Sequence, residues 1–366
     1  SPSARRDAIL VYLSATGKVL LFGGWNGTTA LNDTWEFNTD TRVWTQIFPS
    51  TTPPRRAGST YFYNTLAGAA FMFGGNDGTT YYNDMWRYNP GTQNWQSVFI
   101  SGSKPVGRVG SFASQTTDGR IYFFGGRNAT QVFNDTWMYS ALTGTFVQVT
   151  GSGCTTNCTS SPSPRAFAIG GFIPLTSEFT VVGGISSIGT AQNDAWTLNT
   201  SIQGSETWTQ LAIGLNPDAF TYGTSGQSPS SSFFYFVGGT NTNSAPRTDV
   251  WRYSGITKTW QQYYTSTDTG CSSSAFGSER CSAPPFPRTS PGFFSLSGVP
   301  VVPNKMAAFG GVVATGNKKD FWILDPGSVS GAWSLVGDFT ALDVTNTRLR
   351  PNQVALASNA GVAVRW

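Results

Sequence analysis

The sequence predicts an all-β protein assembled from six copies of one structural repeat. Three recurring features predict this class: a Gly-Gly pair, an Asp-x-Trp after each pair, and a second aromatic residue about ten positions after that tryptophan. A unit that cannot bury its apolar face alone must stack on its neighbours, so the recurrence indicates a stacked array. The pairs are Gly23-Gly24, Gly74-Gly75, Gly125-Gly126, Gly183-Gly184, Gly238-Gly239 and Gly310-Gly311. The tryptophans are Trp35, Trp86, Trp137, Trp196, Trp251 and Trp322, and the closing aromatics are Trp44, Trp95, Phe146, Trp208, Trp260 and Trp333.

The composition agrees with short strands and many turns. Of the 366 residues, 11% are charged and 14% are aromatic, and Ser, Thr, Asn and Gly fill much of the remainder. The formal net charge is +4 without any run of Lys or Arg, which argues against a nucleic-acid partner. No stretch approaches the roughly 18 consecutive apolar residues of a membrane-spanning helix. We therefore expect neither a nucleic-acid partner nor a membrane span in this chain.

The second unit shows most clearly how one repeat should fold. Its apolar runs are short, bounded by turn residues and rich in aromatic side chains, which predicts four strands near 59–63, 69–74, 84–88 and 95–99. Asn89-Pro90-Gly91 supplies turn chemistry between the third and fourth strands. Each repeat should therefore be a four-stranded antiparallel meander.

The same unit resembles the kelch-repeat family. The matching elements are Pro54-Arg55, Gly74-Gly75, Asn83-Asp84-Met85-Trp86 and Trp95, and equivalents recur along residues 1 to about 336. The resemblance implies a six-bladed β-propeller around a central channel, with a seven-bladed or capped ring as the alternative. The six repeats are expected near 1–48, 53–99, 105–149, 163–213, 218–264 and 285–337. Residues 338–366 would then form a C-terminal extension, either a cap or part of a seventh blade.

Repeated glycines and aspartates should serve the scaffold. We expect the Gly-Gly pair to mark a place where a large aromatic of the next blade approaches the backbone, since glycine has no Cβ and tolerates φ > 0. The Asp of each Asp-x-Trp recurs too regularly to be catalytic, so a structural role is expected for Asp33, Asp84, Asp135, Asp194, Asp249 and Asp320.

One face of the propeller is the expected ligand face. In an antiparallel meander, loops between the second and third strands lie on the same side as the loops that join the blades, and the family resemblance raises the expectation of partner binding there. Arginines just before the inner strands should ring the channel mouth, either to bind carboxylate, sulfate or phosphate or to tie backbone carbonyls. The candidate ligand residues are Arg55, Arg108, Arg165, Arg288, Arg127, Arg247, Trp25, Tyr81 and Tyr82, and Phe133 is a further exposed aromatic.

The cysteines and sequons suggest an oxidising compartment. The four cysteines form two local pairs inside the longest inter-blade segments, Cys154/Cys158 and Cys271/Cys281, and local disulfides are favoured over a zinc site. The Asn-x-Ser/Thr sequons are Asn26, Asn32, Asn128, Asn134, Asn157 and Asn199, a number close to chance for this composition. Glycans at Asn26, Asn128 and Asn157 would crowd the ligand face.

These observations favour a binding protein over an enzyme. The chain contains no histidine, which excludes histidine bases, His-dependent nucleophiles and His-ligated metals, including the copper site of the kelch-type radical oxidases. We expect no cofactor and no metal. The leading hypothesis is a non-enzymatic extracellular scaffold that binds a protein or a glycan. The alternatives are a self-assembling structural subunit of a matrix, coat or filament, and a fragment of an intracellular kelch adaptor.

Overall fold

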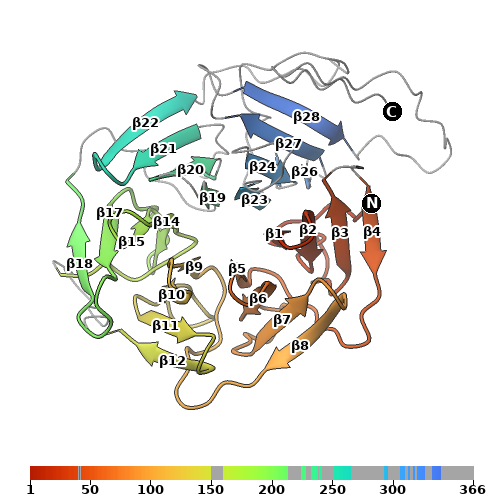
Figure 1. The fold of residues 1–366 in the computed structure, drawn as a ribbon, viewed down its shortest axis with the longest axis horizontal. Coiled ribbons are helices and arrows are strands. Elements are labelled where there is room, and N and C mark those ends of the chain that lie inside the picture. Colours follow the sequence, from red (N-terminus) through yellow and green to blue (C-terminus); the bar gives the residue numbers. More distant parts are fainter. Residues whose placement is uncertain are drawn as a thin grey trace.

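The described strands form antiparallel sheets arranged around a central axis (Figure 1). In the computed structural model, the described residues are 1–39, 41, 43–149, 160–212, 224–227, 232–237, 239–240 and 250–264, together with the strand backbones after residue 264. The first three sheets follow the chain in order. They contain β1 (Ile9–Leu13), β2 (Lys18–Phe22), β3 (Thr34–Asn38) and β4 (Trp44–Ile47); then β5 (Thr60–Asn64), β6 (Ala69–Phe73), β7 (Met85–Asn89) and β8 (Asn94–Val98); then β9 (Phe112–Gln115), β10 (Arg120–Phe124), β11 (Thr136–Ser140) and β12 (Thr145–Gln148).

The later sheets keep this order, with two small additions. They contain β14 (Ile169–Ile173), β15 (Glu178–Val182), β17 (Ala195–Asn199) and β18 (Thr207–Gln210); β19 (Thr224–Gln227), β20 (Phe233–Val237), β21 (Val250–Ser254) and β22 (Thr259–Tyr264); and β23 (Gly292–Ser295), β24 (Met306–Phe309), β27 (Asp320–Asp325) and β28 (Ala332–Asp338). Two-stranded pairs join β13 (Arg165–Ala166) to β16 (Ile185–Ser186), and β25 (Val312–Val313) to β26 (Gly316–Asn317). The described strands thus make six four-stranded sheets, and side chains are described in the five that run from β1 to β22.

The first strand of each sheet lies nearest the axis and the last strand lies at the circumference (Figure 1). Contacts between innermost strands run from β1 to β5, β9, β14, β19 and β23, and β23 contacts β1. Among the described strands, the first sheet consists of the four consecutive strands β1 to β4. The predicted all-β propeller class is confirmed, and the strands expected in the second repeat are each found within one residue of their predicted bounds.

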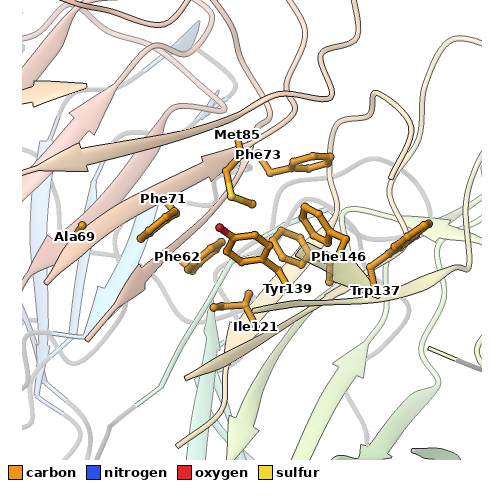
Figure 2. Close-up of a cluster of buried hydrophobic side chains, with 10 residues drawn as sticks. Phe62, Ala69, Phe71, Phe73, Met85, Ile121, Trp137, Tyr139 and Phe146 are labelled. Atoms are coloured by element: carbon orange, nitrogen blue, oxygen red, sulfur yellow. The ribbon is translucent and has the colours of Figure 1, made fainter. Parts of the chain in front are cut away.

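The core lies in the seams between neighbouring sheets. Figure 2 shows the seam between the second and third sheets, where side chains from both sheets, Met85 and Phe146 among them, meet in one apolar cluster. Phe146 packs against Phe73 and Phe123 at centroid distances of 5.5 and 5.3 Å. Aromatic pairs of this kind add stabilisation beyond the area that they bury.

The two adjacent seams contain buried hydrogen bonds around a glutamate. Between the first and second sheets, buried Glu36 accepts hydrogen bonds from Tyr88 Oη (2.8 Å) and Gln93 Nε2 (2.8 Å) and pairs with Lys18. Between the third and fourth sheets, buried Glu206 accepts a hydrogen bond of 2.8 Å from Tyr122 Oη. Burial and these carboxylates raise the pKa of Tyr88 and Tyr122 above the ordinary phenol value.

In the second and fourth repeats, the closing tryptophan docks on the third strand of the preceding sheet. Trp95 Nε1 donates to Thr34 Oγ1 (3.1 Å), and Trp208 Nε1 donates to Thr136 Oγ1 (3.2 Å). Where the closing residue is Phe146, Met85 opens the third strand of the preceding sheet in place of a threonine. At this contact neither Phe146 nor Met85 can form the side-chain hydrogen bond that joins Trp95 to Thr34 and Trp208 to Thr136.

Candidate functional site

Loops between second and third strands lie beside the inter-blade segments, and we call this side of the ring the loop face. In the first three blades, the residue after the Gly pair bridges to the residue after the buried arginine of the same blade: Trp25 with Arg6, Asn76 with Ala57, Arg127 with Val109. For Trp25 and Arg6 the hydrogen bonds run both ways, at 2.8 and 3.0 Å. The loop face is thus held to the inner strands by backbone hydrogen bonds.

The Gly-Gly pair accommodates a backbone carbonyl of the next blade. Gly24 N donates to Arg56 O at 2.9 Å, and a Cβ added at Gly23 (φ +63°) would lie 2.6 Å from the same oxygen. The same contacts join Gly74-Gly75 to Arg108 O and Gly125-Gly126 to Arg165 O. The expectation that an aromatic ring approaches here was wrong, because the space that glycine leaves is taken by a carbonyl oxygen.

The arginine whose carbonyl docks on one blade uses its side chain within its own blade. Arg56 Nη1 donates to Gly74 O (2.9 Å) and to Asp84 Oδ1 (2.6 Å), and Nη2 donates to Asp84 Oδ2 (2.9 Å). Trp86 Nε1 donates to the second oxygen of Asp84 at 2.7 Å. Equivalent clamps join Arg5 to Asp33, Arg108 to Asp135 and Arg165 to Asp194. The structural role expected for these aspartates is confirmed in the four clamps that the structure describes.

The clamp shifts the titration of its carboxylates. Burial by itself raises the pKa of these side chains, but the arginine hydrogen bonds, the arginine charge and the indole hydrogen bond outweigh it. The pKa values of Asp33, Asp84 and Asp194 are therefore held below their ordinary value. These carboxylates stay ionised at neutral pH, which suits an ion pair better than acid–base chemistry.

These contacts correct the predicted ring of ligand-binding arginines. Arg108 and Arg165 are buried and bidentate on their own aspartates, so their guanidinium donors are not presented to a ligand. In the second repeat the clamp residue is Arg56, whereas the predicted Arg55 is its exposed neighbour and reaches only Thr29 Oγ1 at 3.4 Å. Arg288 and Arg247 lie outside the described residues.

A spacing in the sequence could have identified Arg56. The clamp arginine stands 18 residues before the first glycine of its pair at Arg5 and again at Arg56. The separation from the clamp aspartate is 28 residues in both cases. Of the two adjacent arginines at 55 and 56, only Arg56 has these separations, so they identify it as the clamp residue.

Two of the predicted aromatics cover the clamps. The ring of Tyr82 lies 4.1 Å from Arg56 Cζ, and the ring of Phe133 lies 3.9 Å from Arg108 Cζ. Tyr82 Oη also donates to Asp77 Oδ2 (2.8 Å), and Phe133 is buried rather than exposed as predicted. The rings of Tyr82 and Phe133 therefore pack over the buried guanidinium groups of Arg56 and Arg108, and this packing fixes the positions of the rings.

The remaining candidates stay on the accessible surface of the loop face. Arg55 is exposed, and Trp25, Tyr81 and Arg127 are half-buried. Among the residues that the structure describes, the Arg127 guanidinium has no ion-pair partner. The indole of Trp25 reaches the neighbouring loop, where a Cβ at Gly78 would lie 3.5 Å from it. Cationic and aromatic side chains thus lie on the loops of the first three blades.

Asx turns shape these loops and involve two of the predicted sequons. Asn26 Oδ1 accepts from the backbone N of Thr28 and Thr29, each at 2.9 Å, and Asn128 Oδ1 accepts from Thr130 (3.0 Å) and Gln131 (2.9 Å). Asp77 does the same in the second blade, so this position is part of the repeat. The turns hold each loop in one conformation.

The remaining sequons differ in exposure, and the cysteines lie outside the described residues. Asn134 is buried, which opposes its glycosylation, whereas Asn32 and Asn199 are exposed. Asn157 and the four cysteines, Cys154, Cys158, Cys271 and Cys281, lie outside the described residues. Within the part of the chain that is described, no cluster of three or more His, Cys, Asp or Glu is placed to hold a metal ion, and no helix is long and apolar enough to cross a membrane.

Comparisons with known proteins agree with this architecture. A family model described as the KLHDC2/KLHL20/DRC7 Kelch-repeats domain matches residues 1–166. The chain is 27% identical over 160 residues to a Rab9 effector protein with kelch motifs from Xenopus laevis, an alignment that covers 42% of this chain and 44% of the relative. It is 26% identical over 259 residues to a leucine-zipper-like transcriptional regulator 1 homolog from Drosophila melanogaster, covering 65% of this chain and 25% of the relative. A kelch domain-containing protein 1 from Mus musculus is 28% identical over 131 residues, covering 35% and 31%. The chain spans less than half the length of these relatives. The repeated clamp and these matches support the kelch-repeat family, whose model covers residues 1–166.

Proposed function

We propose that this propeller is a non-enzymatic scaffold that binds a protein partner on its loop face. The observation that carries the proposal is that the clamps do not use the cations Arg55 and Arg127, which lie on the same face as Trp25 and Tyr81. Arginine and aromatic side chains are enriched among residues that dominate binding energy at protein interfaces. The excess of cations predicts a partner surface that presents carboxylates or other anionic groups.

Preorganised loops support the same proposal. The Asx turns at Asn26, Asp77 and Asn128 fix the loops before binding, so that a partner would not have to order them. The buried clamp arginines hold the loops in place and would not themselves contact the partner. The proposed site therefore consists of Arg55, Arg127, Trp25 and Tyr81 on a scaffold built by Arg56 and Arg108.

Site-specific photocrosslinking tests this assignment. A photoreactive phenylalanine analogue at Tyr81 should crosslink the natural partner in extracts of the source organism, whereas the same analogue at Leu142, an exposed residue of the β11–β12 turn on the opposite face, should not. Arg127→Ala combined with Arg55→Ala should weaken capture of that partner by about tenfold or more. Equal crosslinking from both faces, or capture that the double substitution leaves unchanged, contradicts the proposal.

Three finer points accompany this function as proposals. We infer a six-bladed ring formed by residues 1–337, supported by the contact of β23 with β1, with residues 338–366 as an extension.

We also propose an extracellular location with Cys154–Cys158 and Cys271–Cys281 disulfides and glycans at exposed sequons such as Asn32 and Asn199. Intact mass before and after reduction tests this: glycan-sized increments and four protons gained on reduction are expected, whereas the bare mass with four free thiols would favour the intracellular adaptor.

A further inference from the structure

The outermost strands of the described blades carry no charged side chain. Strands β4, β8, β12, β18 and β22 contain only aromatic, aliphatic, hydroxyl and amide residues. Proteins commonly guard a free sheet edge with lysine, proline or a bulge, because unpaired backbone groups accept another strand. The first four of these edge strands are four or five residues long and contain no charged residue. A further strand could be added only at an edge that also has space beside it.

The register of β3 and β4 shows which backbone groups face outward. Asn38 N donates to Val43 O (3.0 Å), so this opposite pair is hydrogen-bonded, and in an antiparallel ladder every second pair is. Glu36/Thr45 is then the next bonded pair, and Trp35/Gln46 is a non-bonded pair. The N–H and C=O of Gln46 consequently point away from β3, toward the open edge.

A preformed groove runs along this edge. Residues 45–50 and the β7–β8 turn at 92–94 line a cavity of about 490 Å³. The inter-blade segment is held in place against that turn, because Asn94 Nδ2 donates to Ser50 Oγ (2.9 Å) and Asn94 Oδ1 accepts from Thr51 N (3.1 Å). Phe48 is 82% exposed at the end of β4 and offers an apolar contact beside the groove.

The chain itself shows that an outer strand can take an added segment. In the junction between the second and third blades, Ser101 of the inter-blade segment forms a parallel bridge with Thr145 at the start of β12. Among the described residues, β4 pairs only with β3, and no segment pairs with its outer edge.

We propose that the groove beside β4 binds an extended, uncharged peptide segment of another protein, which adds to the first sheet as a fifth strand. All nine residues that line the groove are uncharged, so a charged segment would lose hydration without gaining a counter-charge. The outward N–H and C=O of Gln46 would supply main-chain affinity, and Phe48 would select an apolar side chain at alternate positions. This site lies at the circumference, beside β4 and the start of β8, and includes none of Arg55, Arg127, Trp25 and Tyr81.

The test uses the intact protein and short random peptides displayed on phage. Selection on the wild-type protein, with Gln46→Pro as the counter-selected variant, should enrich uncharged peptides with β-branched and apolar residues. Synthetic, terminally blocked versions of these peptides are then measured by fluorescence anisotropy. The dissociation constant should rise about tenfold or more in Gln46→Pro and in Phe48→Ser, corresponding to about 1.4 kcal/mol or more. Gln210→Pro is the matched control, since Gln210 occupies the same outward position in β18.

Peptide chemistry supplies a second readout. N-methylation of the peptide amide that bonds to Gln46 should abolish binding, while methylation of the next amide should be tolerated, because adjacent amides of a strand point in opposite directions. If Gln46→Pro does not fold, Phe48→Ser and the methylated peptides still decide the matter. The proposal is overturned if no selected peptide depends on Phe48 or on a single amide. It is also overturned if a neutral oligosaccharide such as maltohexaose binds in a Phe48-dependent way while no peptide does.

Discussion

Removing the carboxylate of one clamp should destabilise the ring far more than removing an adjacent exposed charge. In the second blade the Arg56 side chain is fully buried, whereas Asp84 is 34% exposed. Asp84→Ala leaves a buried guanidinium with the carbonyls of Pro54 and Gly74 and the ring of Tyr82 but no carboxylate, and we expect a loss of about 3–5 kcal/mol in the free energy of unfolding. Arg56→Leu should cost less, about 2–3 kcal/mol, because Asp84 keeps its bond from Trp86 and some contact with water.

A double-substitution cycle separates the ion pair from its surroundings. Urea unfolding followed by circular dichroism gives the free energy for the wild type, both single variants and Arg56→Leu/Asp84→Ala. The double variant should be more stable than the sum of the single losses predicts by about 2 kcal/mol, because no buried charge is left alone. Arg55→Leu is the matched control and should change stability by no more than about 0.5 kcal/mol. A loss under about 1 kcal/mol in Asp84→Ala, or equal losses for Arg55→Leu and Arg56→Leu, would refute the reasoning.

Three further outcomes follow from the junctions. The folded-state pKa values of Asp33, Asp84 and Asp194 are lowered, so the stability that these carboxylates contribute is complete above their ordinary pKa of 3.8 and is lost as pH falls through the folded-state values. Urea titrations from pH 7 to pH 2 should show this loss of stability. In Asp84→Ala the dependence of stability on pH should be weaker. Gly74→Ala should cost more than about 3 kcal/mol, because its Cβ would lie 2.6 Å from Arg108 O, whereas Gly68→Ala (φ +58°, open space) should cost only about 1–2 kcal/mol; equal costs would contradict the carbonyl contact. Thr136→Val should cost about 1–3 kcal/mol by leaving buried Trp208 Nε1 without its acceptor, a loss that the Trp208→Phe background should largely remove.

The repeat was readable from the sequence because its chemistry recurs at nearly constant separations. Gly-Gly, Asp-x-Trp and the closing aromatic predicted the sheets, their order and the strands of the second repeat. The purpose of the glycines could not be read in the same way. Close approach was expected, but the identity of the approaching atom depends on how the next blade is placed, and that atom proved to be the carbonyl oxygen of Arg56, Arg108 or Arg165.

The site was less predictable than the scaffold. Sequence periodicity marks Arg108 and Arg165 as recurring, but it does not tell whether a guanidinium faces the channel or an aspartate of its own blade. The same ambiguity applied to Tyr82 and Phe133, which were expected on the surface and instead cover arginines. The recurring arginines and aspartates of the clamps proved to belong to the scaffold, while the non-recurring Arg127 and Trp25 stayed partly exposed.

The seams of the ring should respond differently to temperature. The seam in Figure 2 depends on apolar contacts around Met85 and Phe146, whereas its neighbours include the buried bonds of Glu36 and Glu206. Hydrophobic stabilisation weakens on cooling, so near-freezing temperatures should loosen the Met85–Phe146 seam before the seams with carboxylates. Among these three seams, the one around Met85 and Phe146 should therefore be the first to open in the cold.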